Sequence, residues 1–348
     1  MNKVKKSSPK ILLIGFGNVG YKLIEIFSKE KNKFPNLSGI DPKFIGIFTK
    51  SHGALVNKSG INLKNALRNF SRRKMFSSNH QDYSKLSAIE AVKKLNYDTL
   101  LELSTLSIND KSETSINFVR EALKRGKNVV TANKGPAAFA YKELTELADK
   151  NNCKFLYESA VMDGAPVFNL FRNDLKGCRI IEVSGILNST TNFILTNMEN
   201  GNTIGNSIKK AQSLGFAEAN PDFDIDGWDA AAKITVLANN LMNASITPFD
   251  VEREGIKDIT FNQIENAVER GYKLKLVCRA WYKNKKLCTR VSVEEVPADH
   301  LFSTVNGSGS ILRVETDLMH PLTIVQEKPD LYDTAYGVIN DLLTTVNR

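Results

Sequence analysis

Short apolar runs and amphipathic helical patterns alternate along the first half of the chain. Apolar residues that recur every three or four positions predict helices, and short continuous apolar runs between turn residues predict buried strands. Strands and helices in this alternation are typical of a parallel sheet with right-handed crossovers. The predicted strands are residues 10–14, 44–48, 99–103, 128–131 and 154–157, and the predicted helices include 88–95, a helix that ends at Gly126, and 137–150.

The pattern changes after residue 160. Residues 179–187 form a predicted strand, and residues 272–281 and 286–296 alternate as strands do, which indicates a mixed sheet with helices on one face. A length of 348 residues also favours two domains. We therefore expect an α/β first domain at 1–160, a mixed α+β second domain at 161–310, and a segment at 311–348 that packs back on the first. Residues 53–86 are expected to form a polar surface loop with a helix.

Three glycines follow the first predicted strand and open the first predicted helix. At this position the first glycine permits a tight turn and the second lets the backbone approach a pyrophosphate, while the helix N-terminus offers unpaired N–H groups. The pattern favours an N-terminal Rossmann domain, a doubly wound parallel sheet that binds a dinucleotide. A tight turn with only a structural role is the alternative. The residues concerned are Gly15, Phe16, Gly17, Asn18, Val19 and Gly20.

Other residues at strand ends are candidates for the same crevice. An acidic residue after the second strand would select NAD, but the chain has Thr49, Lys50, Ser51 and His52 there, so NADP is favoured and NAD stays possible. Lys50 could equally be a solvated loop residue. The next two predicted strands end in further candidates for the cofactor crevice, which are Ser104 and Thr105 after the first and Lys134 after the second. For Lys134 a helix-capping role is the alternative.

An unusually acidic segment occupies residues 212–233. Its Asp222-x-Asp224-x-Asp226-Gly227 run resembles the start of a calcium loop, but Lys233 stands where that loop needs a bidentate Glu. A helix is predicted over 228–242, with Asp229 and Lys233 on one face. Two interpretations remain: an ordinary helix start with favourable acids, or a site that grips a zwitterion through its carboxylates and has a lysine near the chemistry.

A run of short polar side chains lies between the strand at 179–187 and the helix that follows it. The run reads Asn188-Ser189-Thr190-Thr191-Asn192 and offers hydroxyl and amide donors suited to a substrate carboxylate. Asn188 and Thr190 are therefore candidate substrate-binding residues.

Composition and charge argue against several classes of protein, namely nucleic-acid-binding, zinc-binding, secreted and membrane proteins. The net charge of +9 is spread over scattered Lys and Arg residues without a recognition motif, so we expect no nucleic-acid partner. The four cysteines show neither zinc-ligand spacing nor a His cluster, and reduced thiols in a cytoplasmic protein are expected. Apolar runs are too short for a signal peptide or a membrane span.

Five blocks together resemble homoserine dehydrogenase over nearly the whole chain. The resemblance implies NAD(P)-dependent interconversion of L-aspartate 4-semialdehyde and L-homoserine, on the route to threonine and methionine, by a homodimer whose second domain binds substrate and forms the dimer. The last block is specific, whereas the first is common among nucleotide-binding proteins. The blocks are GFGNVG, TANKGP, YESAVMDGAPV, GILNSTTNFIL and AQSLGFAEANPDFDIDGWDAAAKITVLA.

The resemblance also implies roles for individual residues. Lys134 and Lys233 would lie at the reacting centre, and Glu218, Asp224 and Asp229 would bind or orient the amino acid. A turn would hold a monovalent cation, with sodium favoured, mainly through backbone carbonyls; its residues are Glu158, Val161, Asp163 and Ala165.

Two departures from the family pattern matter. Gly307-Ser308-Gly309 replaces the family's glycine-proline-glycine turn, which puts that cofactor contact in doubt. The chain stops at Arg348, so control by threonine through an appended domain is not expected.

The expected mechanism needs a proton donor for the alkoxide that forms on reduction of an aldehyde. A desolvated lysine can serve, and we expect Lys233 in this role with Lys134 as polariser or relay partner, while Asp229 fixes the lysine. A phosphorylating semialdehyde dehydrogenase is disfavoured because Cys153 and Cys178 lie in strand or turn contexts. Another amino-acid dehydrogenase, such as one acting on aspartate, and a non-catalytic dinucleotide sensor are the alternatives.

Overall fold

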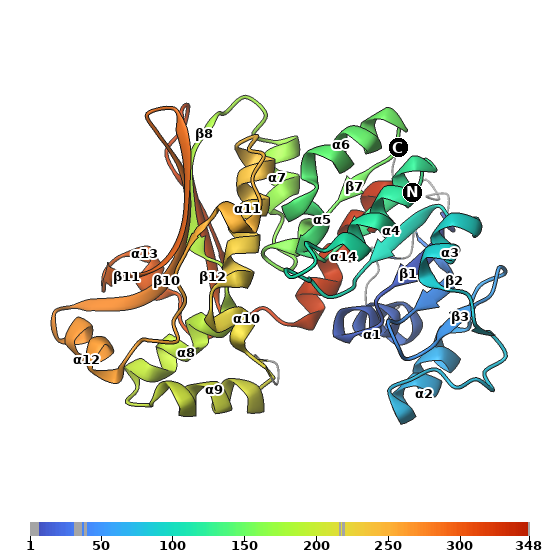
Figure 1. The fold of residues 1–348 in the computed structure, drawn as a ribbon, viewed down its shortest axis with the longest axis horizontal. Helices are drawn as coiled ribbons and strands as arrows, with labels where there is room; N and C mark the ends of the chain where they lie inside the picture. The colour runs from blue at the N-terminus through green and yellow to red at the C-terminus, as the bar shows by residue number, and fades with distance from the viewer. Residues whose placement is uncertain (1–6, 31–36, 38–39, 216, 218–219, 347–348) are drawn as a thin grey trace, which may run out of the picture. The chain divides into compact units, whose positions relative to one another are not determined.

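The computed structural model describes residues 7–30, 37, 40–215, 217 and 220–346, which divide into two compact units. The first unit combines Met1–Pro166 with Asp330–Arg348, and the second is Val167–Pro329 (Figure 1). The return to the first unit thus begins at Asp330, not at residue 311. The reason is that residues 310–326 contribute two strands to the second unit's sheet.

The first unit is built on a seven-stranded sheet in the order β4-β3-β2-β1-β5-β6-β7. Strands β2, β1, β5, β6 and β7 run parallel, which confirms the predicted doubly wound α/β fold. The strands are β1 (Lys10–Ile14), β2 (Lys43–Phe48), β3 (Ala54–Val56), β4 (Tyr83–Ser84), β5 (Thr99–Glu102), β6 (Asn128–Thr131) and β7 (Phe155–Leu156).

Residues 53–86 are more ordered than a surface loop with a helix. Strands β3 and β4 extend one edge of the sheet, and both are antiparallel to their neighbours. Only the helix expected in this segment, α2 (Leu63–Arg73), agrees with the prediction. The other helices of the first unit are α1 (Asn18–Glu25), α3 (Ala88–Lys94), α4 (Glu113–Lys124), α5 (Lys134–Phe139), α6 (Tyr141–Lys150) and α14 (Leu331–Val346), with a short π-helix at Ile26–Glu30 and a 3₁₀ turn at Glu158–Ala160.

Helix α14 completes the core of the first unit. It packs against α1, and its apolar face joins the cluster formed by strands β1 and β2 and helix α1. Burial of such a face stabilises a helix far more than its intrinsic propensity does. The α14 residues in this cluster are Ala335, Val338, Ile339 and Leu342.

The second unit is built on a six-stranded sheet in the order β13-β12-β8-β10-β11-β9. All neighbours pair antiparallel except β11 and β9. The strands are β8 (Ile180–Ile186), β9 (Glu252–Arg253), β10 (Tyr272–Lys283), β11 (Lys286–Pro297), β12 (Ser310–Thr316) and β13 (Leu322–Gln326). The helices are α7 (Val167–Asn173), α8 (Ser189–Glu199), α9 (Ile204–Ser213), α10 (Asp222–Ile225), α11 (Trp228–Leu241), α12 (Phe261–Glu269) and α13 (Leu301–Thr304), with a 3₁₀ turn at Pro248–Asp250.

Helices cover both faces of this second sheet, not one as expected. Successive residues of a strand point to opposite faces. Cys278 of β10 lies against Ala230 of α11, whereas its neighbour Val277 belongs to a cluster with Phe302 of α13. The short helix α13 was not readable from the sequence pattern because it spans a single turn.

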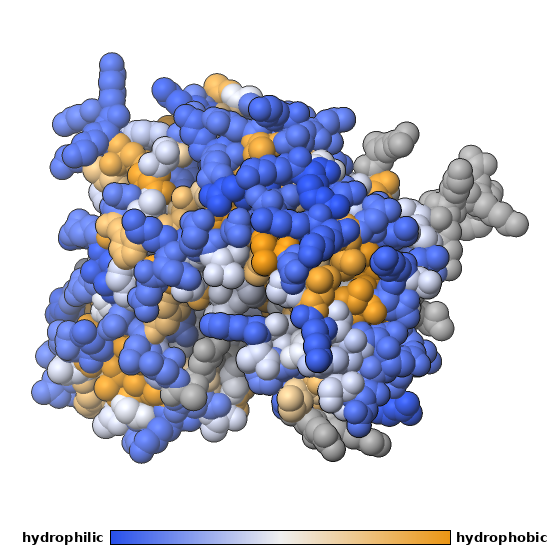
Figure 2. Space-filling model, turned by 45° about the vertical axis from the view of Figure 1, so that its right-hand side comes forward, coloured by the Kyte–Doolittle hydropathy of each residue, from blue (hydrophilic) through white to orange (hydrophobic). Residues whose placement is uncertain are grey.

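Among the described residues, no helix is both long and apolar enough to cross a membrane. The face drawn in Figure 2 is mainly hydrophilic, and its hydrophobic residues gather in separate patches.

Candidate active site

Helix α11 begins at a turn that only glycine adopts easily. Gly227 has φ +79°, and a Cβ at this position would lie 3.0 Å from the Glu254 carbonyl oxygen. The guanidinium of Arg253 lies 3.8 Å from the centre of the Trp228 ring and also bonds the Asp226 carbonyl, which clamps the helix start. The first turns of α11 are therefore held firmly where the candidate catalytic residues stand.

The sequence spacing places Asp229 and Lys233 together, as predicted. Lys233 Nζ lies 3.3 Å from Asp229 Oδ2, and both side chains are nearly buried, with 14% and 11% exposed. Lys233 Nζ also donates to the Leu187 carbonyl at 2.6 Å. Two acceptors from different elements thus fix the position of the ammonium.

Asn188 connects this lysine pair to a second carboxylate. Its Nδ2 donates to Asp229 Oδ2 at 3.0 Å and to Asp224 Oδ1 at 2.7 Å. Its Oδ1 caps α8 by accepting from Thr191 N at 2.7 Å. Asn188 is thus engaged with protein groups on both sides of its amide, and it holds two acids within reach of one amide group.

The two carboxylates shape each other's charge. Burial raises the pKa of Asp224, and the neighbouring negative charge of Asp229 raises it further, while hydrogen bonds from Asn188 and Thr190 oppose the shift. The structure therefore brings together five predicted site residues of the second unit. They are Asn188, Thr190, Asp224, Asp229 and Lys233, whereas Glu218 lies outside the described residues.

Asp226, the third acid of the calcium-like run, has a different environment. Its Oδ1 lies 3.5 Å from Lys257 Nζ, whereas Asp224 bonds Asn188. In the described part of the chain, no group of three or more His, Cys, Asp or Glu side chains is arranged to hold a metal ion.

The glycine turn of the first unit has the geometry expected of a dinucleotide-binding turn. A Cβ on Gly15 (φ +95°) would lie 2.3 Å from the Leu103 backbone, and one on Gly20 would lie 2.3 Å from the Gly15 oxygen. At Gly17 no atom would lie within 4 Å, so this position is open. The outer glycines thus serve packing, and the middle one leaves room for a ligand at the start of α1.

Two neighbours in this turn differ in what they can offer. The Phe16 side chain packs in the core, 4.9 Å from the ring of Phe70, so only its backbone can face a cofactor. Asn18 is exposed, and Val19 packs partly against the core.

Lys50 lies in a tight turn after β2. The turn is closed by Thr49, whose hydroxyl donates to the Gly53 oxygen at 2.8 Å. Lys50 is exposed and forms no hydrogen bond or ion pair with any described residue. A cation in this place suits a phosphate better than it suits a ribose hydroxyl.

Lys134 is the first residue of α5 and follows the end of the parallel strand β6 at Thr131. Asn133 caps this helix by accepting from Gly135 N at 2.9 Å, and Pro136 lies in the first turn, where its missing N–H costs nothing. The helix predicted over 137–150 is therefore two helices, α5 and α6. Lys134 belongs to the first unit, whereas the Lys233 network belongs to the second.

Sequence reasoning missed Glu102, the last residue of β5. Its side chain is fully buried, and burial raises the pKa of its carboxyl, while hydrogen bonds from Ser104, Thr131 and Asn133 oppose the shift. The available signal was one acid in an apolar strand, just before the candidates Ser104 and Thr105. A buried carboxylate at the cofactor edge of a sheet is a candidate functional residue.

The candidate cation turn packs tightly against α14. Glu158 N donates to Asp341 Oδ2 at 2.8 Å, and Asp163 Oδ1 accepts from the Thr334 hydroxyl at 2.7 Å. A Cβ on Gly337 would lie 2.6 Å from the Asp163 carbonyl oxygen, so the helix approaches this turn closely. Val161 and Ala165 lie in the same turn, which offers carbonyl oxygens and the buried Glu158.

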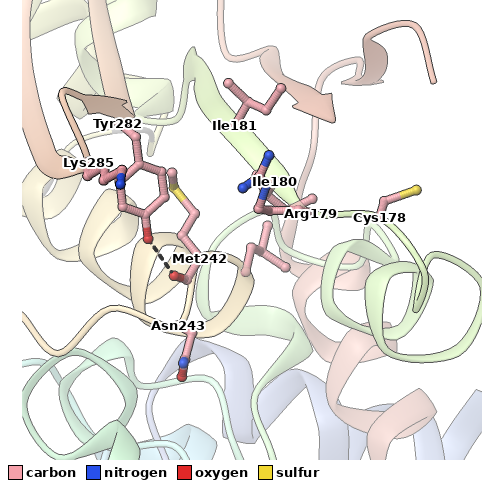
Figure 3. Close-up of a pocket in the computed structure, with 9 residues that line it drawn as sticks. Cys178, Arg179, Ile180, Ile181, Met242, Asn243, Tyr282 and Lys285 are labelled. Carbon is pink, nitrogen blue, oxygen red and sulfur yellow. Dashed lines mark hydrogen bonds between the residues drawn. The ribbon is translucent and has the colours of Figure 1, made fainter. Parts of the chain in front are cut away.

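A pocket lies at the opposite end of α11 (Figure 3). It measures about 620 Å³, and Tyr282 Oη donates to the Met242 carbonyl at 2.9 Å on its wall. No carboxylate lines it, so it lacks the acid–lysine pairing found at the start of the helix. The lining residues are Cys178, Arg179, Ile180, Ile181, Leu241, Met242, Asn243, Tyr282 and Lys285.

Comparisons with known proteins agree over both units. A family model described as "Homoserine dehydrogenase" matches residues 166–343, and one described as "Homoserine dehydrogenase, NAD binding domain" matches residues 15–158. A homoserine dehydrogenase of Methanocaldococcus jannaschii is 34% identical over 340 residues, covering 97% of this chain and 98% of the relative.

Two further matches carry cofactor names. An "NAD(+)-dependent homoserine dehydrogenase" of Pseudomonas canavaninivorans is 31% identical and covers 96% of this chain and 95% of the relative. A solved structure of a hyperthermophilic archaeal homoserine dehydrogenase in complex with NADPH has a TM-score of 0.81 at 28% identity, covering 97% of this chain and 98% of that one.

Proposed function

The chain belongs to the homoserine dehydrogenase family, and from this premise we propose that Lys233, Asp229 and Lys134 carry its chemistry. As a member of this family it is an NAD(P)-dependent oxidoreductase that acts on a CH–OH group, interconverting L-aspartate 4-semialdehyde and L-homoserine. The observation that carries the proposed roles is the Lys233–Asp229–Asn188–Asp224 network.

Lys233 handles the proton of the reacting oxygen. A nicotinamide cofactor, when bound, would supply the hydride exchange with the substrate carbon. The substrate oxygen then needs a proton donor or acceptor at a fixed place. Lys233 Nζ is fixed by Leu187 O and Asp229 Oδ2, which supports this role. In homoserine oxidation the same lysine accepts the hydroxyl proton. Lys134 is proposed as polariser or relay partner.

The acids orient the amino-acid end of the substrate. Asp224 is partly buried and shares the Asn188 amide with Asp229, and two carboxylates gathered in this way favour the binding of an ammonium group. Glu218 completes the ammonium site in this proposal, and Thr190 contributes a hydroxyl near Asp224. Asn188 takes part through the acids it holds.

The dinucleotide occupies the glycine turn of the first unit in this proposal. Its site comprises the backbone from Gly15 to Gly20, together with Ser104, Thr105 and Lys134. NADP is the favoured cofactor, because the turn after β2 contains Lys50 and no acidic residue. One relative is named as NAD-dependent and one similar structure contains NADPH, so the cofactor preference has to be measured.

We also propose a monovalent cation, with sodium favoured, in the turn of Glu158, Val161, Asp163 and Ala165. Carbonyl oxygens and a carboxylate are the hard oxygen donors that such ions prefer. The homodimer and the cytoplasmic location belong to the same proposal. The dimer rests on the family resemblance, and the location on the four free cysteines.

The first test is oxidation of L-homoserine with NADP and, separately, NAD, followed by the absorbance of the reduced nicotinamide, with and without added sodium or potassium. We expect turnover with both cofactors and a higher kcat/KM with NADP. A preference for NAD would contradict the role of Lys50, and turnover of L-aspartate but not homoserine would contradict the substrate.

A further inference from the structure

Glu102 lies at the carboxyl end of β5, where the first sheet meets its cofactor loops. Its side chain is 0% exposed. A carboxylate in this position is costly unless several donors compensate its charge. Its surroundings therefore indicate why an acid occupies the end of an apolar strand.

The carboxylate accepts hydrogen bonds from the loop after β5 and from the end of β6. Oε1 accepts from Ser104 N at 2.9 Å and also from the Ser104 hydroxyl. Oε2 accepts from the Thr131 hydroxyl at 2.9 Å. One side chain thus connects the loop after β5 with the end of β6.

The connection continues into helix α5. Asn133 N donates to Thr131 Oγ1 at 3.0 Å, and Asn133 Nδ2 donates to Ser104 Oγ at 3.3 Å. Asn133 Oδ1 then caps the helix that Lys134 begins. A shift of Glu102 would therefore be felt at both Ser104 and Lys134.

The glycine turn rests on the same loop. Gly15 approaches the backbone of Leu103 and Ser104 so closely that a Cβ on it would lie 2.3 and 2.6 Å from their atoms. The position of the Ser104 backbone, which Glu102 fixes through Ser104 N, thus bears on where the glycine turn lies.

We propose that Glu102 is a positioning residue of the NAD(P) site, which holds the Ser104 loop, the start of α5 and, through Ser104, the glycine turn in one arrangement. This inference rests on the proposed cofactor site, because Ser104, Lys134 and the glycine turn are the residues it positions. Glu102 itself need not touch the cofactor.

The test measures equilibrium binding to the whole protein, of NADPH by nicotinamide fluorescence and of NADP by isothermal titration calorimetry. Glu102→Leu leaves the two Ser104 donors without their acceptor, so the Kd is expected to rise about tenfold or more. At saturating cofactor the KM for homoserine is expected to stay near that of the parent. Glu143→Leu, at an exposed ion pair with Arg120, is the control and should leave the Kd unchanged.

A second pair of variants covers the case in which Glu102→Leu does not fold. Thr131→Val removes the hydroxyl that bonds Glu102, and Thr131→Ser keeps it. We expect the Kd to rise in the first and to return to the parent value in the second. In a double-mutant cycle the Glu102 and Thr131 effects should be less than additive.

Two results would overturn the inference in distinguishable ways. If Thr131→Val and Glu102→Leu bind NADP as the parent does, while Gly17→Val binds weakly, Glu102 has no positioning role although the cofactor site is correct. If Gly17→Val also binds as the parent does, the proposed cofactor site itself is wrong.

Discussion

Lys233, which is nearly buried, and Lys275, which is fully buried, both belong to the second unit and are held in different ways. Lys233 pairs with Asp229 at 3.3 Å and donates to the Leu187 carbonyl. Lys275 is 0% exposed and donates to Asn192 Oδ1 at 3.1 Å and to the Val305 carbonyl at 2.9 Å. It forms no ion pair with any described residue.

The lack of a carboxylate partner among the described residues affects the pKa of Lys275. Burial lowers its pKa to about 8, and the more distant Glu199 only partly opposes the shift. Asparagines near the start of α8 contribute to the surroundings of both lysines. Asn188 donates to Asp229, the partner of Lys233, and Asn192, one turn later, accepts from Lys275. A buried lysine that bonds only neutral acceptors has a structural role, whereas a lysine beside carboxylates can take part in catalysis.

The largest expected effect separates the two lysines by activity. Lys233→Met should lower kcat for homoserine oxidation by roughly 10²- to 10⁴-fold, because the proton of the reacting oxygen loses its partner. Lys275→Met should keep most of the turnover. Steady-state kinetics with thermal unfolding as a control checks both, and an equal loss in the two variants would break the comparison.

Removal of the carboxylate beside Lys233 should have the next largest effect. Asp229→Asn is expected to lower kcat about 10- to 100-fold, because the lysine keeps its bond to the Leu187 carbonyl. The variant also removes a negative charge that raises the pKa of Asp224. The acid limb of the pH–rate profile that reports Asp224 should therefore move to lower pH, and a limb that stays in place would contradict the coupling.

The third prediction concerns stability at alkaline pH. The folded pKa of Lys275, about 8, lies below its ordinary value of 10.5, so the unfolded chain binds the extra proton between these values. The parent's stability should therefore rise as pH increases through this window, by up to about 3 kcal/mol relative to Lys275→Met. Urea unfolding of both proteins below, within and above the window measures the difference, and parallel pH curves would refute it.

The smallest effect is expected at an exposed lysine of the same unit. Lys257 lies 3.5 Å from Asp226, and 63% of its side chain is exposed. Lys257→Ala should change the free energy of unfolding by less than about 1 kcal/mol, and less still at high salt. Urea titrations at two ionic strengths check this. A change in the free energy of unfolding as large as that for Lys275→Met would mean that burial does not explain the difference between Lys257 and Lys275.

The fold was largely predictable from periodicity where the elements are long. The alternation of strands and helices and the glycine turn identified the first unit, whereas β3 and β4 escaped because strands of three and two residues carry too little pattern. The strands at 310–326 were assigned to the wrong unit, because pairing partners far apart in sequence leave no local signal.

The site was predictable only as far as local spacing reaches. Asp229 and Lys233 are four residues apart on a helix, so their pairing could be read directly. The Leu187 carbonyl, 46 residues from Lys233, could not, nor could the contact of Asn188 with two acids 36 and 41 residues away. Glu102 escaped because its partner Thr131 lies 29 residues further along the chain.

Helix α14 has a consequence for how the chain is synthesised. Once residues 7–166 have emerged from the ribosome, the glycine turn and all seven strands of the first sheet have been synthesised. The helix that closes their core, Leu331–Val346, emerges only after the whole second unit. Because domains tend to fold as units during synthesis, the second unit can mature while the first still exposes apolar surface. The nascent first unit is thus the part of this protein that completes its core last.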